Sequence, residues 1–258
     1  MKIETELAQK IISLIDLTSL SGNETLADVI QICQSAMTPY GNTAAVCVYP
    51  NYVQTAKNFL AAKGCKKMKV ATVVNFPSGQ QSIKKVVADT QLAIKHGADE
   101  IDIVLPYHDL ITGNVDSVTT MLSACKQACT EKAALKVIIE SGELGTPELV
   151  KAACQLSLNN GADFIKTSTG KVPVNATLEA ATWILESIKE SGNKQVGIKI
   201  SGGVKTYEQA VEYLTLTQKI MGDHWIDSDH VRFGASSLLM DVMTHIEQTS
   251  ALTSRALK

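Results

Sequence analysis

The chain has 258 residues, of which 45% are hydrophobic and 19% charged, and its formal net charge at pH 7 is -2. This composition supports a large buried core and excludes a disordered chain, and the near-neutral charge gives no general attraction to nucleic acid or to an anionic membrane. No linker-like stretch or charge run divides the sequence, so we expect one domain over residues 1–258.

The beginning of the sequence and its reactive side chains narrow the class of protein further. Residues 1–10 mix charged and polar side chains instead of leading into a long apolar segment, which predicts neither a signal peptide nor a membrane anchor and favours a cytoplasmic protein. The six cysteines show no C-x-x-C spacing, and the five histidines show no H-x-H or H-E-x-x-H arrangement. We therefore expect no disulfide scaffold, no metal site and no cofactor.

Short apolar, β-branched runs recur along the chain at intervals of roughly 25 to 35 residues, which is the length of a βα unit. They read as continuously apolar, as expected for parallel strands that are covered on both faces. A short first run covers residues 14–18, and seven clearer runs cover residues 43–49, 69–76, 100–105, 135–140, 163–168, 196–200 and 231–234.

The segments between these runs carry signals of helix ends. Residues 146–148, Thr-Pro-Glu, predict an N-cap followed by proline in the first turn. Thr206, three residues before Gln209, predicts a capping box. Residues 96–102 and 160–166 share the pattern Gly-Ala-Asp before a strand, so the same helix end and strand entry occurs twice.

Eight strands alternating with helices over this length predict an α/β protein with a single (β/α)8 TIM barrel. The alternative is a doubly wound open sheet. That fold would lead us to expect a G-x-G-x-x-G sequence after the first strand, and the chain has none there.

Two lysines stand in strand-like apolar runs that lead directly into glycine turns. Lys166 lies in Phe-Ile-Lys-Thr-Ser-Thr-Gly-Lys at residues 164–171, and Lys199 lies in Gly-Ile-Lys-Ile-Ser-Gly-Gly at residues 197–203. Because strand side chains alternate between faces, each ammonium group is expected to point opposite to its apolar neighbours, into the interior of a closed barrel. Asp102, in Ile-Asp-Ile, is flanked in the same way. The pattern predicts two amines and one carboxylate in a confined space.

Amine chemistry is one explanation for two lysines in such runs, because a buried ammonium group requires compensation. Two ammonium groups ~4 Å apart repel each other by ~4 kcal/mol at an effective dielectric of ~20. This repulsion lowers the pKa of one lysine toward neutrality and frees its amine as a nucleophile, and burial acts in the same direction. The alternative is that both lysines reach solvent or pair with a carboxylate, and that Asp102 belongs to a structural ion pair.

Glycine-rich loops follow three late strands. In a (β/α)8 barrel the residues at the carboxyl ends of the strands face the active site, and the last loops commonly hold a phosphate group. Backbone N–H groups, hydroxyls and an ammonium group suit that role. The loops contain Gly170-Lys171, Ser201-Gly202-Gly203 and Gly234-Ala235-Ser236-Ser237.

Across nearly its whole length the chain resembles the deoxyribose-phosphate aldolases, which are class I, Schiff-base aldolases. The resemblance is most specific at residues 163–171 (D-F-I-K-T-S-T-G-K), 232–237 (R-F-G-A-S-S), 41–50, 100–104, 175–177, and 199 with 201–203.

The resemblance implies a lyase that joins acetaldehyde to glyceraldehyde 3-phosphate, giving 2-deoxyribose 5-phosphate, and that runs reversibly in deoxyribonucleoside catabolism. Lys166 matches the lysine that forms the imine, Lys199 the lysine that perturbs it, and Asp102 the acid that shuttles protons with a water. Positions that match the family's phosphate loops or substrate-site lining are Asp16, Thr18, Thr169, Gly170, Lys171, Gly202, Gly203, Gly234, Ser236 and Ser237.

Cys47 ends an early strand, so we also expect it at the substrate pocket, where it would react with unsaturated aldehydes. A buried packing thiol is the alternative.

Two features depart from the family pattern. Ile200 and Ser201 replace the proline and alanine that often precede the paired glycines, which predicts a different loop shape. Better-known members end in a tyrosine that assists proton transfer, whereas no tyrosine follows Tyr213 here. Either Asp102 and water remove the proton, or that step is slower.

Two rival functions keep the same barrel and loops. A sugar-phosphate isomerase or epimerase would use the lysines as electrostatic clamps, and a sugar-phosphate sensor would bind without catalysis. The expected partners are small molecules, a phosphorylated sugar and acetaldehyde, with neither nucleic acid nor membrane. The sequence is also compatible with a homodimer.

Overall fold

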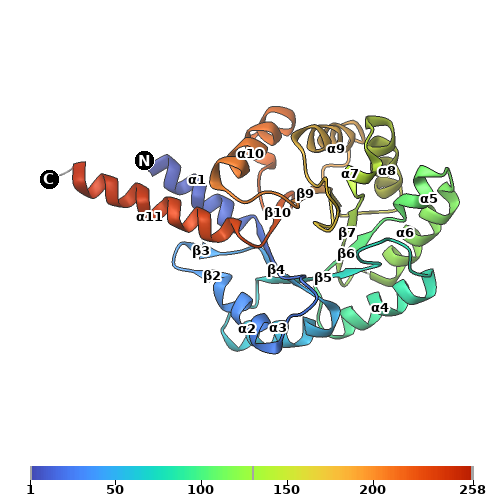
Figure 1. Ribbon diagram of the computed structural model, residues 1–258, viewed down its shortest axis with the longest axis horizontal. Coiled ribbons are helices and arrows are strands. Elements are labelled where there is room, and N and C mark those ends of the chain that lie inside the picture. The colour runs from blue at the N-terminus through green and yellow to red at the C-terminus, as the bar shows by residue number, and fades with distance from the viewer. Residues whose placement is uncertain (1, 130, 257–258) are drawn as a thin grey trace.

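The computed structural model describes residues 2–129 and 131–256, and within it eight parallel strands close into a barrel (Figure 1). Each barrel strand pairs with the next one along the chain, and the last pairs with the first, so the predicted (β/α)8 barrel is confirmed. The barrel strands are β1 (Ile15–Thr18), β4 (Ala45–Val48), β5 (Lys69–Val74), β6 (Glu100–Val104), β7 (Ala134–Ile138), β8 (Phe164–Lys166), β9 (Gly197–Ser201) and β10 (Val231–Ala235).

Helices surround the strands, and Figure 1 shows the first and last helices side by side, extending beyond the ring on one side. The helices are α1 (Lys2–Ser13), α2 (Leu26–Ser35), α3 (Val53–Ala62), α4 (Ile83–Lys95), α5 (Tyr107–Ile111), α6 (Val115–Cys129), α7 (Ser141–Leu144), α8 (Pro147–Asn159), α9 (Leu178–Glu190), α10 (Tyr207–Met221) and α11 (Leu238–Ala256), with 3-10 turns η1 (Pro50–Tyr52) and η2 (Asp223–Trp225). No helix of the described ranges is both long and apolar enough to cross a membrane.

The predicted helix ends are confirmed at α8 and α10. The Thr146 side chain accepts a hydrogen bond from Leu149 N, with Pro147 in the first turn. Thr206 and Gln209 form the reciprocal contacts of a capping box at the start of α10. These caps satisfy backbone N–H groups that a helix start leaves unpaired.

All eight predicted strands are present, but several are shorter than predicted. The run at 163–168 gives a strand of three residues, and the run at 135–140 gives a strand that ends at Ile138. The extra residues leave the sheet to build the loops at the barrel mouth. A short antiparallel hairpin, β2 (Met37–Thr38) with β3 (Gly41–Asn42), was not predicted, because two residues give too little pattern to recognise a strand.

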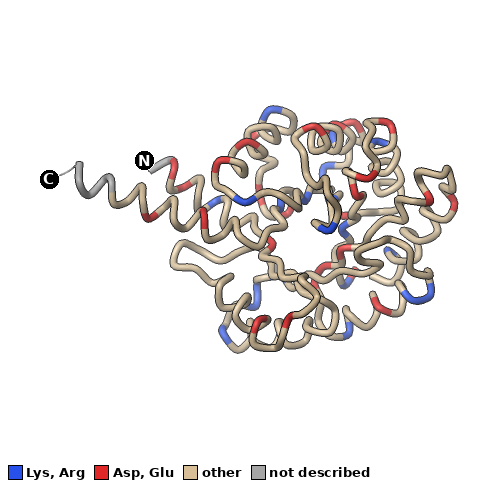
Figure 2. The backbone as a smooth tube through the Cα atoms, viewed as in Figure 1, with Lys and Arg blue, Asp and Glu red and all other residues tan. Residues whose placement is uncertain are grey.

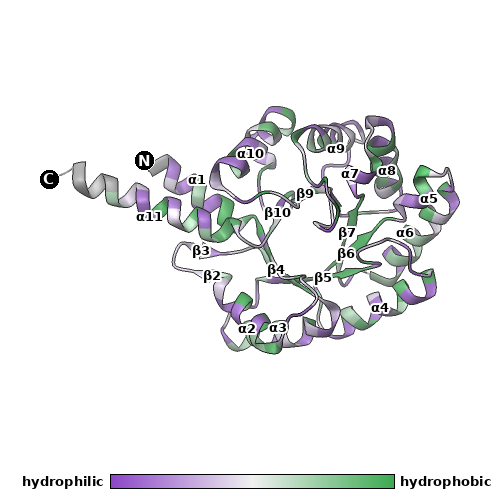
Figure 3. Cartoon of the chain, in the orientation of Figure 1, coloured by the Kyte–Doolittle hydropathy of each residue, from purple (hydrophilic) through white to green (hydrophobic). Residues whose placement is uncertain are grey.

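The two faces of the barrel strands differ in polarity. Ile198 and Ile200 on β9 are buried in the hydrophobic core, which also includes residues of the helices. Figure 3 shows hydrophobic residues on strands such as β6 and β7 and mixed hydrophobic and hydrophilic residues along the helices. Lys199, between the two isoleucines, is fully buried and forms its ion pairs with aspartates of other strands. The late strands therefore alternate between an apolar outer face and a charged inner face, and nearly all of their residues are buried, as expected for parallel strands that are covered on both faces.

Candidate active site

The strand register brings the charged side chains together inside the barrel. Lys166 of β8 lies beside Lys199 of β9, and Lys199 lies beside Arg232 of β10. On the other side, Asp102 of β6 lies beside Lys136 of β7. Neighbouring strands are only about 5 Å apart, so these side chains are within reach of one another.

Asp102 lies at the centre of the cluster and contacts three lysines. Its Oδ2 atom is 2.8 Å from both the Lys166 and the Lys199 Nζ atoms, and its Oδ1 atom is 2.9 Å from the Lys136 Nζ atom. The Nζ atoms of Lys166 and Lys199 can therefore be no farther apart than twice that first distance. The predicted meeting of two amines and one carboxylate is present in the structure.

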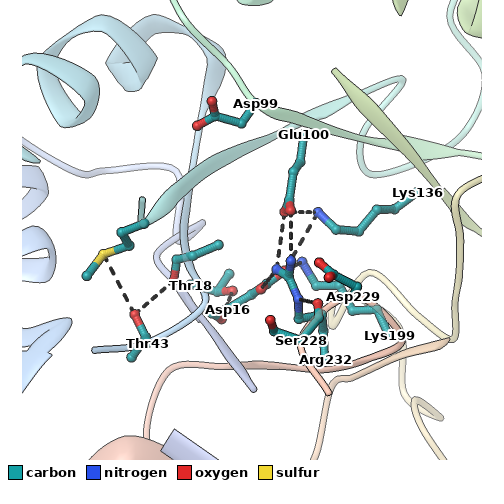
Figure 4. Close-up of polar contacts among 12 residues, drawn as sticks. Asp16, Thr18, Thr43, Asp99, Glu100, Lys136, Lys199, Ser228, Asp229 and Arg232 are labelled. Carbon is teal, nitrogen blue, oxygen red and sulfur yellow. Dashed lines mark hydrogen bonds and ion pairs between the residues drawn. The ribbon is translucent and has the colours of Figure 1, made fainter. Parts of the chain in front are cut away.

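Two more acids and an arginine extend the cluster (Figure 4). Asp16 accepts from Arg232 at 2.6 Å through Oδ1 and lies 2.6 Å from Lys199 through Oδ2. Glu100 pairs with Lys136 at 2.5 Å and with Arg232 at 2.9 Å. We call these seven residues the interior network; its four basic side chains are Lys136, Lys166, Lys199 and Arg232, and its three acids are Asp16, Glu100 and Asp102.

The surroundings distinguish the two central lysines. Burial lowers the pKa of Lys166, Lys199 lowers it further, and the single contact with Asp102 does not restore it. Burial also acts against the charged form of Lys199, but Asp102 and Asp16 outweigh it and raise the pKa of Lys199. The interior network has four basic and three acidic side chains. When the Lys166 amine is neutral, the three remaining positive charges balance the three carboxylates. Burial is a larger cause than the neighbouring cation, which reverses the order of importance expected from the sequence.

A cavity of about 390 Å³ opens above this network. Lys166 is the one basic residue of the network that lines it, and its side chain is 3% exposed, whereas that of Lys199 is 0% exposed. Nine further residues predicted for the site line the same cavity: Thr18, Thr169, Gly170, Lys171, Gly202, Gly203, Gly234, Ser236 and Ser237.

The glycine loops are tied to one another at the cavity rim. Ser201 Oγ donates to the Ser168 carbonyl oxygen at 2.6 Å, and Thr167 Oγ1 accepts from Ser201 N at 3.0 Å. Ser201 thus joins the loop after β9 to the loop after β8. Its hydroxyl group makes one of these contacts, and the alanine that family members often carry at this position has no hydroxyl group. Gly202 has φ +81, and a Cβ atom there would lie 2.6 Å from the Asn175 Cβ atom, so glycine is required on both grounds.

Comparison with known proteins identifies the family. The family model of DeoC/LacD family aldolases matches residues 10–241. This chain belongs to the DeoC/LacD aldolase family. It is therefore an aldolase and a lyase with the TIM-barrel fold.

Solved structures agree with this assignment. A candidate deoxyribose-phosphate aldolase from Coccidioides immitis is 31% identical with a TM-score of 0.80, over 92% of this chain and 86% of that chain. A deoxyribose phosphate aldolase from Aeropyrum pernix, described as having a unique tetrameric structure, is 25% identical with a TM-score of 0.75, over 97% of this chain and 98% of that chain. A candidate enzyme from Toxoplasma gondii shares the fold at 24% identity and a TM-score of 0.87, over 96% of this chain and 98% of that chain.

Besides Asp102 and Lys199, two residues predicted to line the substrate site are fully buried and do not line the cavity. Asp16 belongs to the interior network below it. Cys47 packs with Leu20, Ala71 and Val73, and burial raises the pKa of its thiol. The structure therefore does not bring Cys47 to the cavity wall, and the alternative of a packing thiol describes it better. The sequence predictions about the two chain ends are covered only in part. Residue 1 at the N-terminus and residues 257 and 258 at the C-terminus lie outside the described residues.

Sequence reasoning missed three members of the interior network, the cavity-lining residue Lys205 and one buried residue behind the rim. Lys136 stands between the apolar residues Leu135 and Val137, the same pattern as Lys199, but no glycine turn follows it directly. Glu100 and Arg232 lie in segments where the family resemblance is specific, but nothing in the sequence singled out their own side chains. Glu140, which ends a predicted strand, is fully buried next to the loop after β8.

Proposed function

We propose that this protein is a class I aldolase that reversibly cleaves 2-deoxy-D-ribose 5-phosphate to D-glyceraldehyde 3-phosphate and acetaldehyde through a Schiff base on Lys166. One observation carries the proposal. Lys166 and Lys199 share a single carboxylate oxygen, and only Lys166 of this pair lines the cavity. Family membership and the resemblance at residues 163–171 support the choice of substrate.

Lys166 is the nucleophile because it is the lysine with the lowered pKa. Its neutral amine adds to the aldehyde carbon of the open-chain sugar, and loss of water with uptake of one proton leaves a protonated imine. Lys199 stays protonated, since Asp102 and Asp16 hold its charge. It therefore keeps one positive charge beside Lys166 throughout the cycle.

Asp102, acting through a water, accepts the proton of the sugar's 3-hydroxyl group. The bond between C2 and C3 of the sugar breaks, and glyceraldehyde 3-phosphate leaves. The electron pair of the broken bond moves toward the protonated imine and converts it to a neutral enamine. Lys166 is one of three lysines that together hold the pKa of Asp102 well below its usual range, although burial acts against them. As the positive charge on the Lys166 nitrogen disappears, the pKa of the Asp102 carboxyl group rises and Asp102 becomes a better base. The proton then returns to C2, and hydrolysis releases acetaldehyde and the free amine.

The glycine loops hold the phosphate group at the other end of the cavity. Lys171 and Lys205 line the rim and are exposed, so their ammonium groups are available to an anion. Holding the phosphate fixes the distance between the aldehyde carbon and the Lys166 nitrogen, which favours the reaction through proximity. Such an enzyme would serve deoxyribonucleoside catabolism.

Borohydride reduction in the presence of acetaldehyde tests the mechanism. We expect a two-carbon adduct on Lys166, located by peptide mapping, and its loss in Lys166→Ala. Lys84→Ala is the control, because Lys84 is an exposed lysine of α4. An adduct that survives Lys166→Ala would refute the proposal. Turnover without borohydride inactivation would indicate an isomerase, and saturable binding of the sugar phosphate without release of acetaldehyde would indicate a sensor.

A further inference from the structure

Glu140 follows β7 with a backbone conformation that is unusual for its residue type. Its φ of 54 and ψ of 58 lie in the left-handed region. Residues with a Cβ atom adopt this conformation at an energetic cost, whereas glycine adopts it freely. A carboxylate stands where glycine would give the easier turn, and strained residues of this kind gather at functional sites.

The Glu140 carboxylate is fully buried and points at one residue of the cavity rim. Its Oε1 atom accepts from Thr169 N at 3.1 Å, and its Oε2 atom accepts from Thr169 Oγ1 at 2.5 Å. The Thr169 hydroxyl group therefore gives its only proton to Glu140. The Thr169 hydroxyl oxygen accepts a hydrogen bond from Lys171 N at 3.0 Å. Glu140 is therefore linked through Thr169 to the backbone of Lys171.

The same turn contacts the loop after β8 at two further points. Ser141 N donates to the Thr167 carbonyl oxygen at 2.9 Å. A Cβ atom on Gly142 would lie 1.9 Å from the Val174 carbonyl oxygen, so the start of α7 packs directly on the loop. Residues 140–142 thus contact the loop at Thr167, Thr169 and Val174, on both sides of the rim residues Gly170 and Lys171.

We propose that Glu140 is a positioning residue for the phosphate group of the substrate, acting through Thr169 on residues 169–171 without touching the substrate. Glu140 does not line the cavity, whereas Thr169, Gly170 and Lys171 do. A carboxylate close to a phosphate repels it, so the contribution of Glu140 is geometric: it holds the backbone N–H groups and the Lys171 side chain in one arrangement. This inference rests on the proposed function, which places a phosphate at these loops.

Two variants at position 140 test the proposal, with one control. Glu140→Gln keeps the size of the side chain but replaces one of the two carboxylate oxygens that accept from Thr169 with an NH2 group, which cannot accept a hydrogen bond. Glu140→Gly removes the carboxylate and suits the left-handed backbone, so it is expected to fold. Glu143→Gln changes an exposed acid of the same helix and should behave as wild type.

The measurements are the Kd for inorganic phosphate by calorimetry, the KM for 2-deoxyribose 5-phosphate, and the rate of borohydride trapping of acetaldehyde on Lys166. We expect both position-140 variants to raise the Kd and KM about tenfold, on the order of one charge-assisted hydrogen bond. The trapping rate should be unchanged, because acetaldehyde has no phosphate. A general loss of structure would instead lower trapping as well.

Thr169→Val separates positioning from a local structural role. If Glu140 acts through Thr169, the loss of phosphate binding in the double variant Glu140→Gln/Thr169→Val should be smaller than the sum of the two single losses, because Thr169→Val leaves Glu140 only the backbone N–H group of residue 169. Additive losses, or an unchanged Kd in both position-140 variants, would overturn the inference even where the Lys166 adduct forms normally. Absence of that adduct, with phosphate binding and its dependence on Glu140 intact, would instead count against the proposed function alone.

Discussion

Lys136 is fully buried, like Lys199, and does not line the cavity. It occupies the Oδ1 atom of Asp102 and also pairs with Glu100. Lys166 and Lys199 share the other oxygen, Oδ2. Lys136 therefore fixes the orientation of the carboxylate on which the pKa difference between the other two lysines depends.

Lys136→Met should destabilise the protein by about 3–5 kcal/mol, because it leaves Glu100 and Asp102 buried with one cation fewer. Urea unfolding measures this loss. Lys151→Met is the control, because Lys151 and its partner Glu186 are both about half exposed and 3.5 Å apart. Such surface pairs contribute about 0–1 kcal/mol. Equal losses for the two variants would contradict the importance of the interior network.

The pH dependence of imine formation should move in opposite directions in two variants. Trapping on Lys166 rises with pH through its folded-state pKa, which lies below the ordinary value for lysine. Lys199→Met removes the cation that lowers this pKa, so the profile should move to higher pH. Asp102→Asn removes the carboxylate that raises it, so the profile should move to lower pH. Single-turnover trapping across a pH series measures both, and shifts in the same direction would refute the assignment of causes.

At the scale of the element, Gly197 decides how closely β9 and β8 approach each other. A Cβ atom at this position would lie 2.5 Å from Cε1 of Phe164 and 2.6 Å from the His230 carbonyl oxygen. The Phe164 ring in turn faces Lys136 and Arg232, at 5.9 and 5.4 Å from its centroid. The missing side chain thus leaves room for an aromatic ring against the interior network.

Gly197→Ala should cost about 1–3 kcal/mol through overpacking of the Phe164 ring. Gln195→Ala, two residues earlier and exposed, should stay within about 0.5 kcal/mol of wild type. Thermal unfolding distinguishes them. A stable Gly197→Ala protein would show that the ring moves without cost.

Elements set by local signals were predictable from the sequence. The repeated segments 96–102 and 160–166 form matching corners. Asp99 accepts from Val70 N and pairs with Lys57, and Asp163 accepts from Leu135 N and pairs with Lys126. Each corner joins a helix end to a strand entry, so its pattern lies in a few consecutive residues. Strand ends were less predictable, because tertiary contacts decide where residues such as Glu140 leave the sheet.

The site was only partly predictable for a similar reason. Lys166 and Lys199 are recognisable because each precedes a glycine loop, and the resemblance assigned their roles. Lys136 has the same apolar neighbours, but its contact with Asp102 depends on the register of β6 against β7, which no local pattern specifies. The difference in pKa between Lys166 and Lys199 likewise depends on Asp16, which is far from both in the sequence.

At the scale of the whole molecule, charge is divided between two environments. Figure 2 shows Lys, Arg, Asp and Glu on the surrounding helices and also on the strands within the ring. The inner charges compensate one another within the interior network, whose residues are at most 3% exposed. The cations at the cavity rim, Lys171 and Lys205, are exposed.

This division has a consequence for ionic strength. The Debye length falls from about 10 Å at 0.1 M salt to about 3 Å at 1 M, and dissolved ions screen exposed charges far more than buried ones. Added salt should therefore weaken phosphate binding severalfold while leaving the rate of acetaldehyde trapping on Lys166 nearly constant. Calorimetry and borohydride trapping over a sodium chloride series would check this, and a parallel decline of both would mean that electrolyte reaches the barrel interior.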